Sequence, residues 1–169
     1  MFALTPAIDR LKEAASASHL RACIFLLLLS FAAFLPGYST LQPLDRDEPR
    51  FAQASKQMLE TGDFVDIRFQ DEARHKKPVG IYWLQSAAVK AGEALGVPEA
   101  RTQIWLYRIP SLIGATATVL LTYWALLAFL SPPLALFGRA LMAAAVCPGV
   151  EARIAKTDGL LSARAVSTM

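Results

Sequence analysis

A cluster of charged residues at the end of an uncharged segment carries side chains suited to acid–base chemistry. Residues 22–44 contain no charge, and Asp47, Glu48 and Arg50 follow within the next six residues. A carboxylate at a water–membrane boundary can take a proton from a hydroxyl group as that group attacks a sugar carbon. Asp47 also suits a helix N-cap and Glu48 the positive end of a helix, so a structural role is the alternative for both.

Basic side chains in the same polar region are candidates for holding a phosphate group. Arg50 is followed by Arg74, Lys76 and Lys77. Arginine can form two parallel bonds to phosphate oxygens, lysine supplies a point charge, and fixed cations stabilise a departing phosphate. The same run of charges is also typical of a solvated surface. His75 lies beside these residues, and a single histidine predicts no metal site.

Long uncharged segments indicate that the chain crosses a membrane. A helix needs about 20 apolar residues to span the hydrocarbon core. Residues 22–44 and 109–138 meet this length, and residues 134–150 meet it marginally, with Arg139 near their start. A long basic side chain at a helix end can reach the headgroups. The first segment could instead be a signal peptide, but it is long for one and no Ala-x-Ala site closes it.

The sequence therefore predicts an all-α, multi-pass membrane protein whose N-terminus is cytoplasmic. Basic residues outnumber acidic ones in the N-terminal tail, as the positive-inside rule requires. The predicted parts are a cytoplasmic amphipathic tail (1–21), transmembrane helices (22–44, 105–130, 134–150), an extracytoplasmic loop (45–104) with juxtamembrane helices at about 48–61 and 79–95, and an extracytoplasmic C-terminal segment (151–169).

The loop holds most of the charge. Of the 31 charged residues, 20 lie between Asp45 and Arg108. The net charge of +3 is too small and scattered to favour nucleic acid as a partner. Cys23 and Cys147 lie inside apolar segments and form neither a metal motif nor a disulfide framework.

Asp158 is a second acid predicted on the same side of the membrane as Asp47. It follows the third transmembrane segment, where it could share a site with Asp47 or cap a further helix. Leu160 and Leu161 look like the start of a fourth apolar helix, but the chain ends soon after them. We therefore expect the sequence to be a fragment of a longer membrane protein or a truncated product.

Several short motifs occur in a fixed order along this polar region. They are Asp45-Arg-Asp-Glu-Pro-Arg-Phe51, Met58-Leu-x-Thr-Gly-Asp63, Lys77-Pro78-x-x-x-Tyr82-Trp83 and Lys156-Thr-Asp158-x-Leu-Leu. Together they resemble the membrane glycosyltransferases that use polyprenyl-phosphate sugars. These include the protein O-mannosyltransferases and the bacterial aminoarabinose transferases that modify lipid A. The resemblance covers about residues 20 to 161, which would be the N-terminal third of a full-length member.

The resemblance implies a GT-C fold in a bacterial-type inner (plasma) membrane. It implies inverting transfer of a sugar from a polyprenyl-phosphate donor to a hydroxyl group of a lipid, protein or glycan acceptor. Asp47 matches the catalytic acidic residue of the family, and Asp158 matches a further acidic position near the donor cavity. The residues expected to bind substrate are Glu48, Arg50, Lys76, Lys77 and Tyr82.

The sequence also departs from the family pattern. Lys76 stands where the aminoarabinose transferases have an acidic residue that helps to bind a metal, so a divalent metal is left open and no cofactor is assigned. Phe51 replaces a tyrosine that is common in the family. We expect this polypeptide alone to be inactive. The alternatives are a non-catalytic membrane subunit, with the charged loop as a docking surface, and an inactive truncated product.

Overall fold

The computed structural model describes residues 18–43, 46–74, 77–144, 152–155 and 158–168. Helices make up most of this part of the chain, which confirms the predicted all-α class. The expected tail at residues 1–21 lies almost wholly outside the described residues. The same holds for Cys147 and for the end of the third predicted transmembrane segment.

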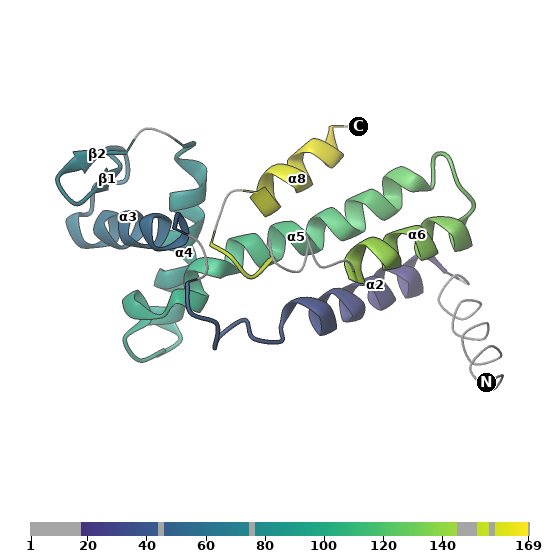
Figure 1. Ribbon diagram of the computed structural model, residues 1–169, viewed down its shortest axis with the longest axis horizontal. Coiled ribbons are helices and arrows are strands. Elements are labelled where there is room, and N and C mark those ends of the chain that lie inside the picture. The colour runs from purple at the N-terminus through teal and green to yellow at the C-terminus, as the bar shows by residue number, and fades with distance from the viewer. Residues whose placement is uncertain (1–17, 44–45, 75–76, 145–151, 156–157, 169) are drawn as a thin grey trace.

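Three apolar helices form an elongated bundle. They are α2 (His19–Phe34), α5 (Ile104–Leu126) and α6 (Pro132–Ala144), and each of them packs against the other two (Figure 1). Each helix turns an apolar stripe inward, because residues three or four positions apart share one face. The buried core of the bundle includes Ala22, Leu26, Phe34, Ala115, Val119, Tyr123, Ala135, Leu136 and Ala143.

The outward faces of these helices are also apolar. On α2 and its C-cap residue, large apolar side chains are exposed at helical spacing, with 40–69% of each residue exposed: Leu20, Ile24, Leu28, Phe31 and Leu35. Similar residues are exposed on α5 and α6, namely Ile113, Trp124, Leu134, Phe137 and Leu141. The bundle is therefore apolar on its surface as well as in its core.

Among the described residues, only α5 is both long and apolar enough to cross a membrane. One membrane-span candidate is thus found in the described part of the chain, and the prediction of three transmembrane helices stays a prediction. Helix α2 has 16 residues and ends at Phe34, whereas the uncharged segment continues to residue 44. At 1.5 Å per residue this helix is about 24 Å long. The chain leaves the helix where Pro36 and Gly37 follow, and Gly37 has a positive φ of 79°.

Arg139 does not lie where the sequence suggested. Instead of reaching outward from a helix end, its side chain is inside the bundle, with 2% of the residue exposed. Its Nε donates a hydrogen bond to the carbonyl oxygen of Val119 on α5 at 3.0 Å. The burial follows from the helical period, because Arg139 shares the inward face of α6 with Ala135 and Ala143.

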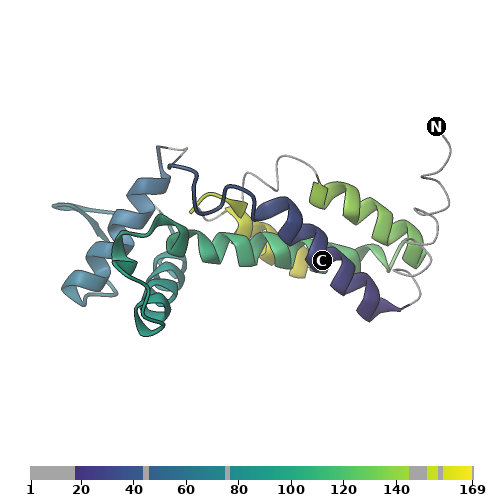
Figure 2. The ribbon, with the colours of Figure 1, turned by 90° about the horizontal axis from the view of Figure 1, so that it is seen from below.

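A polar lobe, which we define as residues 46–102, lies at one end of the bundle. It contains α3 (Glu48–Thr61), β1 (Arg68–Phe69), β2 (Glu72–Ala73), α4 (Gly80–Ala94) and the 3-10 helix η1 (Ala100–Thr102). Helix α4 runs across the direction of α5 (Figure 2). The two strands pair antiparallel as a short hairpin, with Arg68 opposite Ala73. The helices correspond to those expected at about 48–61 and 79–95.

Local sequence explains how the polar lobe folds back on itself. Gly62 ends α3 in the left-handed conformation, with a φ of 74°, which glycine adopts without steric cost. The hairpin then returns the chain towards α3, and the backbone N–H of Arg74 donates to the carbonyl of Ile67 at 2.7 Å. Ile67 belongs to a buried cluster with Phe51 and Tyr82, so the hairpin places Arg74 next to α3.

The last described helix, α8 (Asp158–Ser167), packs along α5 (Figure 1). Leu160 in its first turn also contacts the buried cluster around Phe51 and Tyr82. A segment far along the sequence is thereby brought to the start of the polar lobe.

Candidate functional site

Asp47 and Arg50 form an ion pair at the start of α3. Asp47 occupies the N-cap position, but its side chain makes no capping bond to the helix backbone, contrary to the structural role considered from the sequence. Its Oδ1 accepts instead from Nη1 of Arg50 at 3.4 Å. The side chains of Arg50 and Asp47 are 37% and 44% exposed. The carboxylate is thus held beside a cation and remains accessible from outside.

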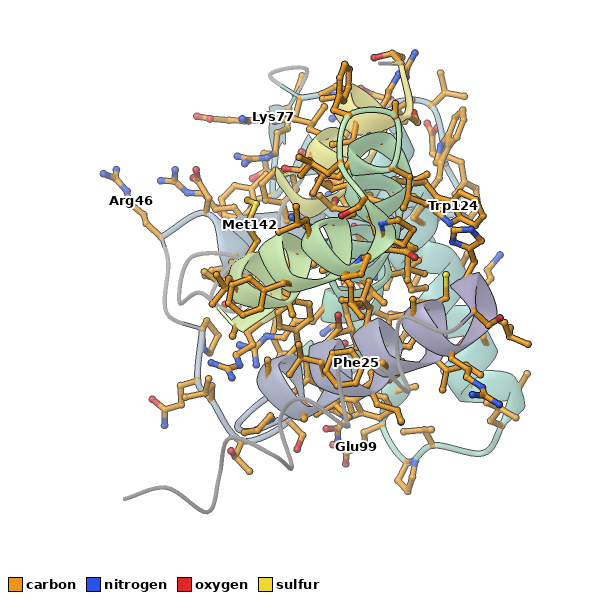
Figure 3. The ribbon with its side chains drawn as sticks, turned by 90° about the vertical axis from the view of Figure 1, so that its right-hand side faces the viewer. Phe25, Arg46, Lys77, Glu99, Trp124 and Met142 are labelled. Atoms are coloured by element: carbon orange, nitrogen blue, oxygen red, sulfur yellow. The ribbon has the colours of Figure 1, made fainter. Side chains whose placement is uncertain are left out.

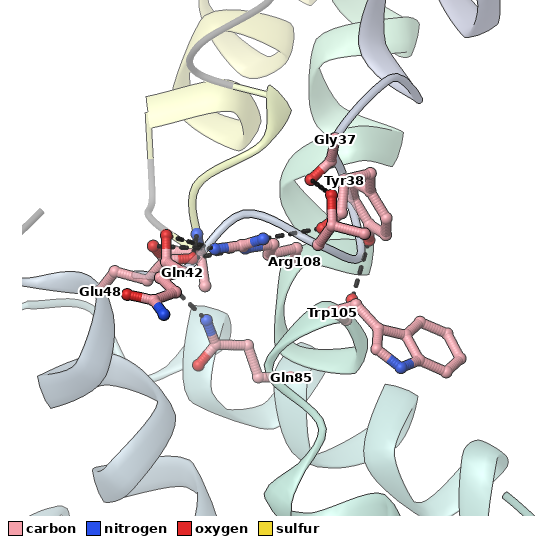
Figure 4. A network of polar contacts seen from close by, with 9 residues as sticks. Gly37, Tyr38, Gln42, Glu48, Gln85, Trp105 and Arg108 are labelled. Atoms are coloured by element: carbon pink, nitrogen blue, oxygen red, sulfur yellow. Dashed lines mark hydrogen bonds and ion pairs between the residues drawn. The ribbon is translucent and has the colours of Figure 1, made fainter. Parts of the chain in front are cut away.

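Glu48, the next residue, is fully buried and bound to Arg108 of α5. Nε of Arg108 donates to Oε1 of Glu48 at 2.7 Å, and Nη2 donates to Oε2 at 3.3 Å (Figure 4). Both side chains are 0% exposed. A buried charge is tolerated when it is paired and hydrogen-bonded. Glu48 was expected to bind substrate. In the structure it is buried and anchors the start of α3 to the apolar bundle.

The remaining donors of Arg108 hold the chain that links α2 to α3. Nη1 donates to the carbonyl of Tyr38 at 2.7 Å, and Nη2 reaches the carbonyl of Gln42 at 3.5 Å (Figure 4). The hydroxyl of Tyr38 donates in turn to the carbonyl of Trp105 at 2.9 Å. Asp47 therefore lies between the connection from α2 to α3, which Arg108 holds, and the buried ion pair of Glu48 with Arg108.

The same ion pair also fixes the segment that precedes Asp158. The backbone N–H of Ala155 donates to Oε1 of Glu48 at 3.1 Å. On the other side of this segment, Arg153 donates through Nη2 to the carbonyl of Ala33 at 2.5 Å, near the end of α2. Residues 152–155 are thus fastened between the bundle and the start of α3.

Gln85 completes this buried network from α4. Its Nε2 reaches the carbonyl of Ala155 at 3.5 Å (Figure 4). Its Oε1 accepts from the hydroxyl of Ser55 on α3 at 2.6 Å. Both Gln85 and Ser55 are 0% exposed. The network therefore joins α3, α4, α5 and residues 152–155 around a single buried carboxylate.

The two acids proposed as catalytic lie on segments that meet at the start of α3. Asp158 is the first residue of α8, and its side chain lies outside what the structure describes. It is bracketed by Ala155, which binds Glu48, and by Leu160, which contacts the cluster around Phe51. The backbone thus brings the position of Asp158 into the neighbourhood of Asp47.

Arg74 is held on two buried aromatic rings. Its guanidinium lies over the ring of Phe51, with Cζ 5.3 Å from the ring centroid, and its Nε donates to the hydroxyl of Tyr82 at 3.1 Å. The two rings stack on each other at 5.4 Å. Tyr82 was expected to bind substrate, but it is 0% exposed and supports Arg74 instead.

Lys77 lies on the loop between Arg74 and Tyr82, and both of these residues contact Phe51. Lys77 itself is exposed, as is Arg46, and Figure 3 shows the two at the periphery of the molecule. Lys76 and His75 lie outside the described residues. The structure thus pairs Asp47 with Arg50, and it leaves Lys77 on a neighbouring loop.

Sequence reasoning missed two parts of this arrangement. Arg108 was noted only as the end of the charge-rich region, although an arginine within an apolar helix needs a counter-ion, and Glu48 was an available one. Phe51 was noted only as the replacement for a tyrosine in the first motif. Its helical spacing with Ala54 did not indicate that the ring of Phe51 also lies beneath the guanidinium of Arg74.

The site combines an accessible carboxylate, an adjacent guanidinium and a second guanidinium fixed on aromatic rings. Such groups can accept a proton from a hydroxyl and hold an anion. Within the described residues, no three His, Cys, Asp or Glu side chains gather as metal ligands would. Comparison of the chain with models of protein families, with curated proteins and with solved structures found no match.

Proposed function

We propose that the chain is the N-terminal part of an inverting glycosyltransferase that uses a polyprenyl-phosphate sugar. The observation that carries the proposal is the ion pair of Asp47 with Arg50, on the helix that also holds Phe51, over which Arg74 lies. A lipid-linked substrate needs an apolar environment for its chain and cations for its phosphate. A base near that phosphate would complete the requirements for transfer to a hydroxyl group.

The proposed membrane placement is supported by the apolar outer faces of α2, α5 and α6. Soluble monomers rarely expose a contiguous apolar surface of this kind, whereas lipid tails would cover it. In the proposed topology the three helices belong to three transmembrane segments, the N-terminus is cytoplasmic, and the polar lobe is extracytoplasmic. The bacterial-type inner membrane is the proposed location.

In the proposed reaction, the oxygen of the acceptor hydroxyl attacks C1 of the sugar from the face opposite the lipid phosphate. The bond from C1 to the phosphate oxygen breaks, and its electron pair stays on the phosphate. The hydroxyl proton passes to the carboxylate of Asp47. Attack from the opposite face inverts C1. Arg50, whose Nη1 lies 3.4 Å from Oδ1 of Asp47, helps to hold that carboxylate in position.

Replacement of Asp47 by asparagine tests the proposal. We expect Asp47→Asn to lower the rate of sugar transfer at least about 100-fold, because general-base catalysis contributes about this factor or more. The assay measures transfer from a polyprenyl-phosphate sugar in membranes that contain a transferase with this sequence at its N-terminus. Asp63→Asn is the matched control, since Asp63 is an exposed carboxylate elsewhere in the polar lobe.

The alternative of a non-catalytic subunit predicts a different result. Asp47→Asn would then leave transfer within about threefold of the parent rate, which is too little for a general base. That outcome would reject the catalytic role of Asp47. The exposed position of Lys77 would in that case favour the polar lobe as a docking surface.

A further inference from the structure

Arg74 is a firmly positioned cation beside α3. Its backbone N–H is bound to Ile67, its Nε to Tyr82, and its guanidinium plane rests over Phe51. Phe51 is 1% exposed and Tyr82 is 0% exposed, so the surface beneath the guanidinium is rigid. By contrast, Lys77 is exposed and makes no such contacts within the described chain.

The guanidinium of Arg74 lacks a counter-ion in the part of the chain that the structure describes. Its Nε is used by the Tyr82 hydroxyl, a neutral acceptor, and none of the described carboxylates forms an ion pair with it. This differs from Arg50, which pairs with Asp47, and from Arg108, which pairs with Glu48. The two Nη groups of Arg74 are thus left to donate to a ligand.

We infer that Arg74 binds the phosphate group of the lipid-linked donor, with Tyr82 and Phe51 as its positioning residues. The inference rests on the proposed function and assigns a phosphate ligand to one residue of the site. A planar guanidinium with two open Nη groups matches two oxygens of a phosphate, a geometry that an ammonium group cannot reproduce. Because the guanidinium of Arg74 is held in place before the phosphate binds, less side-chain entropy is lost on binding.

The position of Arg74 fits this role. Phe51, which carries the guanidinium, directly follows Arg50, the partner of Asp47. Leu160 of α8 contacts the same aromatic cluster, so the first turn of α8 lies on another side of it. A phosphate bound at Arg74 would therefore lie near the proposed base and near the segment that begins with Asp158.

The test is equilibrium binding of farnesyl phosphate to the 169-residue chain in phosphatidylcholine nanodiscs. We expect Arg74→Gln to weaken binding at least tenfold and Arg74→Lys at least fivefold. Arg46→Gln, which removes an exposed arginine in the same lobe, should change binding less than twofold. Binding by Arg74→Gln within threefold of the parent chain would overturn the inference, as would equal binding of farnesol, which has no phosphate.

A second variant tests the inference even if the Arg74 substitutions cause misfolding. Tyr82→Phe removes only the hydroxyl that accepts from Nε and keeps the stacked ring. We expect three- to tenfold weaker binding of farnesyl phosphate with an unchanged unfolding midpoint. Unchanged binding in Tyr82→Phe would reject Tyr82 as a positioning residue.

Further experiments distinguish the phosphate of a lipid-linked donor from inorganic phosphate and from a lipid headgroup. They also distinguish failure of this inference from failure of the proposed function. Inorganic phosphate that binds as tightly as farnesyl phosphate would overturn the assignment to a lipid donor. Nanodiscs with phosphatidylglycerol should not abolish binding of farnesyl phosphate, whereas full competition would point to a general headgroup site and overturn it too. If Arg74-dependent binding persists while Asp47→Asn leaves transfer intact, the proposed function fails and the phosphate site stands.

Discussion

Replacement of Arg108 by methionine should lower the free energy of unfolding by about 3–5 kcal/mol, the usual cost of removing one partner of a buried ion pair. The carboxylate of Glu48 would remain at 0% exposure without its guanidinium. The carbonyls of Tyr38 and Gln42 would also lose their donors. Methionine keeps an unbranched apolar side chain in place, so the loss reflects charge and hydrogen bonding more than an empty volume. Denaturant unfolding in neutral detergent, followed by tryptophan fluorescence, measures the change.

Two comparisons make the Arg108 result specific. Arg101→Met breaks the exposed pair with Glu93, 2.6 Å apart, and should cost no more than about 1 kcal/mol because water screens such pairs. The double variant Glu48→Gln/Arg108→Met should be more stable than Arg108→Met alone, since no unpaired charge is then buried and glutamine can still accept from Ala155. A cost of under about 1 kcal/mol for Arg108→Met would contradict the buried network.

Phe51→Ala should destabilise the protein by about 3–5 kcal/mol, the range for removing a large buried aromatic side chain. Phe51 is 1% exposed and packs within the cluster that joins α3, the hairpin and α4. Its removal would leave a cavity between Tyr82 and Met58 and would also take away the ring beneath Arg74. The unfolding experiment used for Arg108 measures the first effect, and farnesyl phosphate binding measures the second.

Two other substitutions separate packing from the support of Arg74. Phe51→Leu keeps much of the apolar volume and should cost clearly less stability than Phe51→Ala, yet it removes the ring and should still weaken phosphate binding. Phe129→Ala removes a phenylalanine that is 84% exposed and should change stability by less than about 0.5 kcal/mol. Equal stability of Phe51→Ala and the parent chain would show that the aromatic cluster is not a core.

The helices of the polar lobe could be predicted from sequence because their signals are local. Asp47 and Pro49 mark the start of α3, and Gly62 marks its end. The end of α2 was harder to place, because the uncharged segment continues past it to residue 44 and only Pro36 and Gly37 signal a break. The inward position of Arg139 was also missed, since hydropathy does not tell which face of α6 meets its neighbours.

The site could be predicted only in part, because its contacts join residues far apart in the sequence. Glu48 and Arg108 are 60 residues apart, and Glu48 and Ala155 are 107 apart. Asp47 and Arg50 are only three residues apart at the start of α3, so their ion pair follows from local spacing. The sequence could not show that Tyr82 turns inward to bind Arg74, because an aromatic residue near a helix start fits a membrane interface equally well.

The proposed function requires that the polar lobe faces the outside of a membrane in which the bundle is embedded. The most direct test is to label Lys77→Cys in intact cells with a membrane-impermeant maleimide, after both native cysteines have been replaced by serine. Lys77 is exposed, so its replacement should react. We predict labelling from outside intact cells without permeabilisation. Labelling only after permeabilisation, or recovery of the protein in the soluble fraction, would contradict the account.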